Sequence, residues 1–197
     1  MRHGISGLQP IVSQGCRGRR VSSGSDHPGA VERLFADTIA AVGRPDIAVN
    51  TIGKVLKKPM IEITEAEYDE MTAVNSKSAF FFLKEAGKHV NDNGKICTLV
   101  TSLLGAFTPF YAAYAGTKAP VEHFTRAASK EFGGGGISVT ASGPGPIDTP
   151  FFYPAEGEDA QAYHKTTAAL SKFRRQVSLI SKTSFPTSVS WSPMVGG

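Results

Sequence analysis

The sequence has few of the features that mark membrane, disulfide-rich or metal-binding proteins. Its 197 residues include only two cysteines, Cys16 and Cys97, which are too few for a disulfide framework, and no Cys/His spacing typical of zinc. It has no run of 18 apolar residues, the length needed to span a membrane, and residues 1–10 lack an apolar stretch of signal-peptide length. We therefore expect a cytoplasmic protein with no metal and no membrane partner.

Charged residues are few, and the net positive charge is concentrated at the two ends of the chain. Hydrophobic residues make up 41% of the chain and charged residues 19%, a composition that can fill a core. Residues 1–28 carry a net charge of +3 and residues 171–197 a net of +4, whereas the stretch between them is mildly acidic. Basic ends leave a nucleic-acid binder as one alternative, but the basic residues are few, dispersed and without interleaved aromatics, so this partner is not the one we expect.

The chain divides into three parts by pattern. Residues 1–28 and 173–197 are rich in Arg, Ser, Gly and Pro, and neither shows a period of 2 or 3.6. We predict two irregular basic tails around one domain over residues 29–172. The abrupt change in composition at both ends suggests translation in a shifted frame or a wrong exon choice, which the other two reading frames of the encoding DNA test.

The middle part alternates between helical and extended patterns. Apolar residues recur at helical spacing before Gly43, and Thr64 with Glu67 forms a capping box that opens a long helix. We expect helices over residues 31–42, 64–90 and 111–132, and strands over 47–49, 96–101 and 137–141. This alternation predicts an α/β fold with parallel βαβ units, a doubly wound sheet with flanking helices.

One residue pair suggests proton-transfer chemistry. Tyr114 and Lys118 are four residues apart on a predicted helix, so their side chains lie on one face. A nearby lysine cation favours the phenolate and lowers the pKa of a tyrosine, which suits acid–base catalysis. The spacing alone is common, and a surface pair is the alternative. Asn50, Ser102 and the stretch 143–146 follow the three predicted strands, at the edge where open α/β sheets bind ligands.

Five segments together resemble the short-chain dehydrogenase/reductase family, with a broad similarity to its 3-oxoacyl-carrier-protein reductases. They are residues 46–53, 74–75, 100–105, 114–118 and 143–150. The resemblance covers about residues 29–172. It implies a Rossmann-like fold and an oxidoreductase that uses NAD or NADP to transfer hydride between nicotinamide and a carbonyl or secondary alcohol. It also implies homodimers or homotetramers formed through the helices over 64–90 and 111–132.

The resemblance implies a role for each matching residue. Tyr114 would exchange a proton with the substrate oxygen, which Ser102 would polarise. Lys118 would hold the nicotinamide ribose and lower the pKa of Tyr114, and Asn75 would help to hold a water of the proton relay. Each residue also has an alternative without a catalytic role: Asn75 as an exposed polar residue, Asn50 as a turn residue and Ser102 as a helix or turn cap.

Two further sets of residues follow from the resemblance. The segments that would line the cofactor contribute, besides Tyr114 and Lys118, the residues Asn50, Gly53, Pro144, Gly145, Ile147 and Thr149. The mobile lid over the substrate would contain Phe151, Phe152, Tyr153 and Tyr163. Outside these sets, we expect Cys97 to be buried and inert, and residues 80–82 to serve the core or a subunit interface.

The chain departs from the family pattern in three places. Residues 50–53 read Asn-Thr-Ile-Gly where the family reads Asn-Asn-Ala-Gly. Pro120 removes a helical N–H, so we expect the helix to start late or to bend there. Residues 1–28 contain no Thr-Gly-x-x-x-Gly-x-Gly turn for the cofactor pyrophosphate, so the sheet is expected to lack its first strands. A catalytically inactive fragment that acts only through its interface helices is therefore the main alternative to an enzyme.

Overall fold

Helices and strands alternate along the described part of the chain. The computed structural model describes residues 28–106, 108–147, 151 and 157–158. Its longer helices and its strands are, in chain order, α1 (Pro28–Val42), β1 (Ile47–Asn50), α2 (Glu65–Met71), α3 (Ser78–His89), β2 (Lys95–Leu99), α4 (Ala112–Glu131) and β3 (Ser138–Ser142). The three strands form a parallel sheet in the order β1-β2-β3. The predicted α/β fold, with parallel strands and flanking helices, is confirmed.

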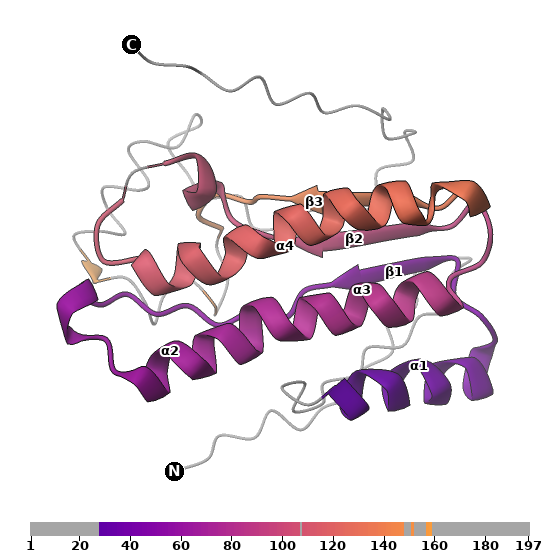
Figure 1. The fold of residues 1–197 in the computed structure, drawn as a ribbon, viewed down its shortest axis with the longest axis horizontal. Coiled ribbons are helices and arrows are strands. Elements are labelled where there is room, and N and C mark those ends of the chain that lie inside the picture. The colour runs from indigo at the N-terminus through magenta and orange to yellow at the C-terminus, as the bar shows by residue number, and fades with distance from the viewer. Residues whose placement is uncertain (1–27, 107, 148–150, 152–156, 159–197) are drawn as a thin grey trace.

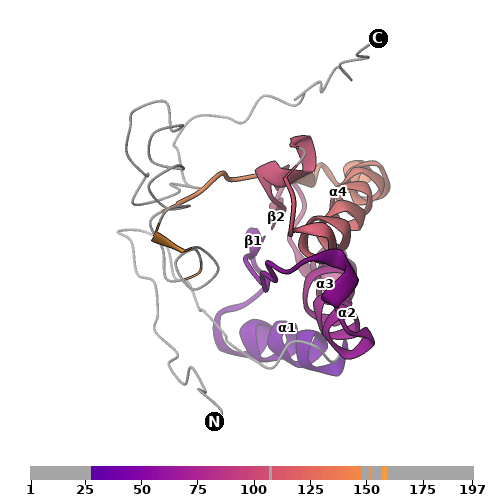
Figure 2. The ribbon, with the colours of Figure 1, turned by 90° about the vertical axis from the view of Figure 1, so that its left-hand side faces the viewer.

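The described helices lie on one face of this sheet (Figures 1 and 2). Ala48, Ile96 and Val139 are register partners on neighbouring strands, and all three are buried on the helical side. Their side chains pack against apolar residues of α1, α3 and α4, namely Val31, Phe35, Phe82, Leu83, Ala86 and Ala128. Ile47 and Val49 point to the opposite face, where 56% and 38% of their surface is exposed. Alternation along the strands thus gives the sheet one packed face and one open face.

The first turn of α2 has the capping box that the sequence predicts. Thr64 Oγ1 accepts a hydrogen bond from the Glu67 backbone N–H at 3.2 Å, and the Glu67 carboxylate accepts from the Thr64 N–H at 2.8 Å. Lys58 Nζ lies 3.0 Å from both carboxylate oxygens. Backbone and lysine donors together lower the pKa of Glu67 to about 2. This cap fixes where the chain turns from the loop after β1 into the helix.

The long helix predicted over residues 64–90 runs from Glu65 to His89 and contains one π-helical turn. A π-helical turn, Thr72–Lys77, separates α2 from α3. Within it Asn75 is completely buried, and its amide hydrogen bonds with both backbone groups of Lys54, in the loop after β1. Such turns are often found at functional sites, because the change in helical phase re-aims a side chain. Local sequence patterns do not report it, since the partner of Asn75 is 21 residues away.

The third long helix lies within one residue of the predicted bounds, 111–132, so Pro120 does not delay its start. Helix α4 begins at Ala112, and Pro120 lies inside it. Proline has no N–H to donate to the carbonyl of Gly116, so one bond of the helical ladder is missing. The helix ends in a run of glycines: residues 133–135 form a 3₁₀ turn, and Gly136 has a left-handed φ of 71°.

Two smaller observations complete the fold. Cys97, expected to be buried, is only half-buried on the open face of β2, and burial raises the pKa of its thiol. Among the residues that the structure describes, no helix is both long enough and apolar enough to cross a membrane.

Candidate active site

The ends of β2 and β3 stay paired beyond the strands themselves. The Val100 N–H donates to the Ser142 carbonyl at 2.9 Å, and the Ser102 N–H donates to the Pro144 carbonyl at 3.1 Å. Between these two bonds, a Cβ on Gly143 would lie 3.3 Å from the Thr101 backbone. A side chain larger than hydrogen is therefore crowded at residue 143, and the two segments form one edge with Thr101 and Ser102 on it.

Lys118 lies buried beneath this edge. Only 3% of its surface is exposed, and its Nζ donates to the carbonyls of Ile52 at 3.1 Å and Leu99 at 3.0 Å. It thereby links the loop after β1 to the end of β2. Burial lowers the pKa of Lys118 to about 8, because the charged ammonium loses its hydration. The third N–H of the ammonium bonds to no partner among the described residues.

Gly53 makes room for this lysine. A Cβ at residue 53 would lie 3.0 Å from Lys118 Nζ and 3.4 Å from Asn75 Oδ1. The glycine that survives in the Asn-Thr-Ile-Gly stretch is thus the position at which two buried polar side chains approach the backbone. Nearby, Asn50 is 3% exposed and its Oδ1 accepts from the Ile52 N–H at 2.9 Å, so it shapes the turn after β1.

Asn75 reaches the same loop from the π-helical turn. Its Nδ2 donates to the Lys54 carbonyl at 2.9 Å and to Thr117 Oγ1 at 3.0 Å. Its Oδ1 accepts from the Lys54 N–H at 2.9 Å. The reading of Asn75 as an exposed polar residue is therefore wrong. The amide connects the loop after β1 with helix α4.

Tyr114 begins the turn of α4 that ends in Lys118. It is 7% exposed and packs with Met71, Tyr111 and Ala113. Burial raises the pKa of its phenol, and a hydrogen bond with the Thr101 side chain opposes the rise. The sequence predicts that Lys118 lowers the pKa of Tyr114, but this pKa is raised. The phenolate loses more by leaving water than it gains from its contacts. Thr101 is not among the residues predicted for the site, although its place beside Ser102 at a strand end is a usable signal.

Ser102 and the segment after β3 complete the edge. Ser102 is exposed at the start of a 3₁₀ turn, Ser102–Gly105, and its Oγ would lie 3.7 Å from a Cβ on Gly145. Pro144 and Ile147 continue the same segment. Of the other predicted residues, Phe151 is 47% exposed, whereas Thr149, Phe152, Tyr153 and Tyr163 lie outside the described residues.

A family model described as enoyl-(acyl carrier protein) reductase matches residues 21–180 of this chain. Among curated proteins, a short-chain dehydrogenase/reductase of Armillaria gallica is 30% identical over 151 residues, 75% of this chain and 58% of its own length. The chain belongs to the short-chain dehydrogenase/reductase family. Members of this oxidoreductase family share the Rossmann-like fold to which the three-stranded sheet and its helices correspond.

Other members of the family are similar over the same part of the chain. A hydroxynaphthalene reductase-like protein of Metarhizium brunneum is 33% identical over 159 residues, 80% of this chain and 57% of that protein. A Burkholderia cenocepacia protein assigned as a dehydrogenase, with bound NADP in its crystal structure, is 71% identical with a TM-score of 0.76. The match covers 80% of this chain and 59% of that structure. The chain therefore spans less than two thirds of the length of these relatives.

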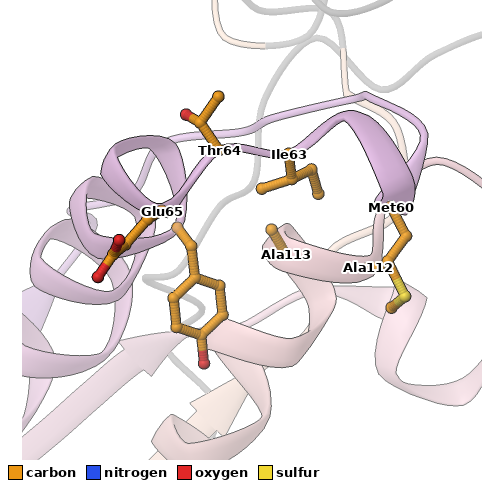
Figure 3. Close-up of a pocket in the computed structure, with 7 residues that line it drawn as sticks. Met60, Ile63, Thr64, Glu65, Ala112 and Ala113 are labelled. Carbon is orange, nitrogen blue, oxygen red and sulfur yellow. The ribbon is translucent and has the colours of Figure 1, made fainter.

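A pocket of about 340 Å³ lies beside this candidate site, next to Tyr114 in the chain at Ala113 (Figure 3). It opens between the start of α2 and the start of α4, and its lining consists of Met60, Ile63, Thr64, Glu65, Tyr68, Ala112 and Ala113. None of the four residues predicted to be catalytic lines it. In the described part of the chain, no group of three His, Cys, Asp or Glu side chains could hold a metal ion.

Proposed function

We propose that this chain is an NAD(P)-dependent oxidoreductase in which Tyr114 exchanges a proton with the oxygen of a carbonyl or secondary alcohol. One observation carries the proposal: Lys118 is a buried cation, tied to Ile52 and Leu99, on the helical turn that follows Tyr114. Burying a lysine ammonium costs folding stability, and charged groups buried at such a cost are often found at functional sites. A cation at the ligand-binding edge of an α/β sheet fits a polar ligand there.

The described residues fit the nicotinamide end of a dinucleotide. The ammonium of Lys118 uses two of its three N–H groups on backbone carbonyls, so one remains to donate to a ribose hydroxyl. Asn50 and Gly53 shape the loop beside it, and Pro144, Gly145 and Ile147 belong to the segment that would line the ring. Within residues 28–106 and 108–147, no glycine-rich turn opens a helix toward a pyrophosphate. The Burkholderia cenocepacia relative holds NADP, which supports the same cofactor class here.

When bound, the nicotinamide supplies or accepts the hydride. In the reductive direction, the Tyr114 hydroxyl gives its proton to the carbonyl oxygen and becomes a phenolate. The Thr101 side chain bonds to that phenol oxygen and opposes the rise in the Tyr114 pKa that burial causes. Ser102, exposed at the same edge, would donate a hydrogen bond to the substrate oxygen. In the oxidative direction, the Tyr114 phenolate takes the proton from the alcohol.

Titration of the purified chain with NADH and NADPH, followed by nicotinamide fluorescence, tests the proposal. We expect saturable binding that Lys118→Ala weakens about tenfold, because one hydrogen bond from a charged group is lost. Lys130→Ala, an exposed lysine on the same helix, is the matched control. Tyr114→Phe should leave binding unchanged and lower turnover of a carbonyl substrate at least a hundredfold.

Failure of this experiment separates the alternatives. A folded chain that binds neither cofactor would support the inactive fragment, which then acts at most through its interface helices. Binding to nucleic acid that falls steeply with salt, and that is lost on deletion of residues 1–28 and 171–197, would support the nucleic-acid alternative.

We further propose that α3 and α4 pair with a second copy of this chain. Phe80 is 48% exposed on α3. Its ring makes edge-on contacts with Phe81 and Phe124, at centroid distances of 5.5 and 5.3 Å. An exposed aromatic group across two adjacent helices is typical of a protein interface rather than of a free surface. This supports the homodimer or homotetramer that the family resemblance implies.

A further inference from the structure

Thr117 lies between the two residues that the proposed function makes catalytic. It is 3% exposed, so no substrate reaches it. Its hydroxyl donates to the carbonyl of Ala113 at 2.7 Å, and the carbonyl of Tyr114 is a second acceptor at 3.1 Å. The same oxygen accepts from Asn75 Nδ2 at 3.0 Å. A single buried hydroxyl therefore ties the first turn of α4 to the π-helical turn.

A second hydroxyl from the π-helical turn holds the same stretch of α4. Ser76 Oγ donates to the Thr117 carbonyl. This contact lies next to the missing ladder bond, because Pro120 offers no N–H to the Gly116 carbonyl. Helices bend most easily where such a bond is absent. The turn that carries Tyr114 and Lys118 is thus held from outside at the place where its own helix is weakest.

The other end of this connection is the loop on which Lys118 rests. Asn75 bonds to both the N–H and the carbonyl of Lys54. Two residues earlier, the Ile52 carbonyl accepts from Lys118 Nζ. The path from Thr117 through Asn75 to this loop therefore returns to Lys118 itself. These hydrogen bonds limit how far the loop after β1 and the α4 turn with Tyr114 and Lys118 can move apart.

We propose that Thr117 is a positioning residue for the reaction of the proposed function, assisted by Ser76. It holds Tyr114 and Lys118 at a set distance from the loop 52–54 through the amide of Asn75. Loss of its hydroxyl leaves a buried N–H of Asn75 without its acceptor, and such a group is costly to leave unpaired. The loop, Asn75 and the α4 turn then shift relative to one another, while no atom that touches substrate is removed.

The test compares two buried threonines of one helix. Thr117→Val removes the hydroxyl and keeps the shape of the side chain. Thr125→Val is the matched control, because Thr125 is 4% exposed and bonds to Val121 and Thr98, two turns away from the site. We expect Thr117→Val to lower kcat about tenfold with KM changed less than twofold. Thr117→Ser should restore kcat, and Thr125→Val should leave it within twofold.

A readout without catalysis keeps the inference separate from the proposed function. The Lys54 N–H donates to Asn75 Oδ1, so its hydrogen exchange reports whether Asn75 is held. We expect exchange at Lys54 to be about tenfold faster in Thr117→Val and unchanged in Thr125→Val. Equal exchange rates in the two variants would overturn the inference. A wild-type chain that binds no cofactor would overturn the proposed function instead, and the exchange measurement would still decide the role of Thr117.

Ser76→Ala extends the test should Thr117→Val fold poorly. Ser76 is half-buried, so this change leaves the core intact. We expect kcat to fall about threefold at an unchanged melting temperature, since one of two contacts to the turn is lost. An unchanged kcat would remove Ser76 from the proposal, and an equal fall in stability and activity would mark the contact as structural only.

Discussion

The cost of burying one charged residue can be measured. Lys118 has a pKa of about 8 in the folded chain, against 10.5 for the free side chain. Between these values the unfolded chain binds more protons than the folded one, so stability rises with pH. We expect the free energy of unfolding to increase by about 2 kcal/mol between pH 8 and pH 10 from this group. Urea denaturation at both pH values measures the increase.

Lys118→Met is the variant that identifies the source of this rise. It removes the titrating group and keeps the apolar stem of the side chain. The rise between pH 8 and pH 10 should be absent in this variant. An equal rise in both proteins would show that another group is responsible. Tyr114 cannot be that group, because its raised pKa makes stability fall, rather than rise, above pH 10.

A second prediction at the residue scale concerns Thr101. Its side chain bonds to the Tyr114 phenol and holds down a pKa that burial raises. Thr101→Val removes that bond, so the pKa of Tyr114 should rise further. Titration of ¹³C-labelled tyrosine, with Tyr114→Phe to assign the signal, measures the shift. Thr101→Ser keeps the hydroxyl and should match the wild-type chain, and a wild-type pKa in Thr101→Val would contradict the contact.

At the scale of the element, the capping box decides where α2 begins. Thr64→Ala removes the acceptor of the Glu67 N–H, which should lower the free energy of unfolding by about 1 kcal/mol. Thermal unfolding at neutral pH measures the loss. Glu62→Ala, just before the cap and exposed, should change the stability by less than about 0.5 kcal/mol.

The same cap predicts an acid dependence. The pKa of Glu67 is about 2 in the folded chain and 4.5 in its reference state, so its contribution to stability is complete above pH 4.5. That contribution is lost as the pH falls from 4.5 toward 2. Removal of the Thr64 hydroxyl weakens the cap, so stability should fall less steeply over this range in Thr64→Ala. An unchanged slope would show that the Thr64 backbone N–H and Lys58 hold the carboxylate without the hydroxyl.

At the scale of the whole molecule, the aromatic group on α3 and α4 predicts self-association. Phe80→Asp places a charge where an apolar partner would lie, so it should shift the chain toward monomer by at least tenfold in the dissociation constant. Sedimentation equilibrium measures the shift. Met60→Ser, another exposed apolar residue (72% exposed) away from these helices, is the control and should leave the association unchanged. A wild-type chain that stays monomeric would contradict the proposed pairing.

Most elements of the described fold follow from local patterns in the sequence. The cap at Thr64, the glycines that end α4 and the alternating strands each depend on residues within a few positions of one another. The π-helical turn and the place of Pro120 inside α4 do not follow in this way. Asn75 is drawn inward by Lys54, and α4 includes Pro120 because tertiary contacts hold the turn that the proline weakens.

Motifs and short-range periodicity are enough to predict the family, the order of helices and strands, and the candidate site residues. The packed structure adds that Asn75 is buried, that Thr101 bonds to Tyr114 and Thr117 to Asn75, and that burial sets the pKa directions of Tyr114 and Lys118. The physical reason is distance along the chain. Burial and hydrogen bonds between residues tens of positions apart exist only after the sheet and helices have packed.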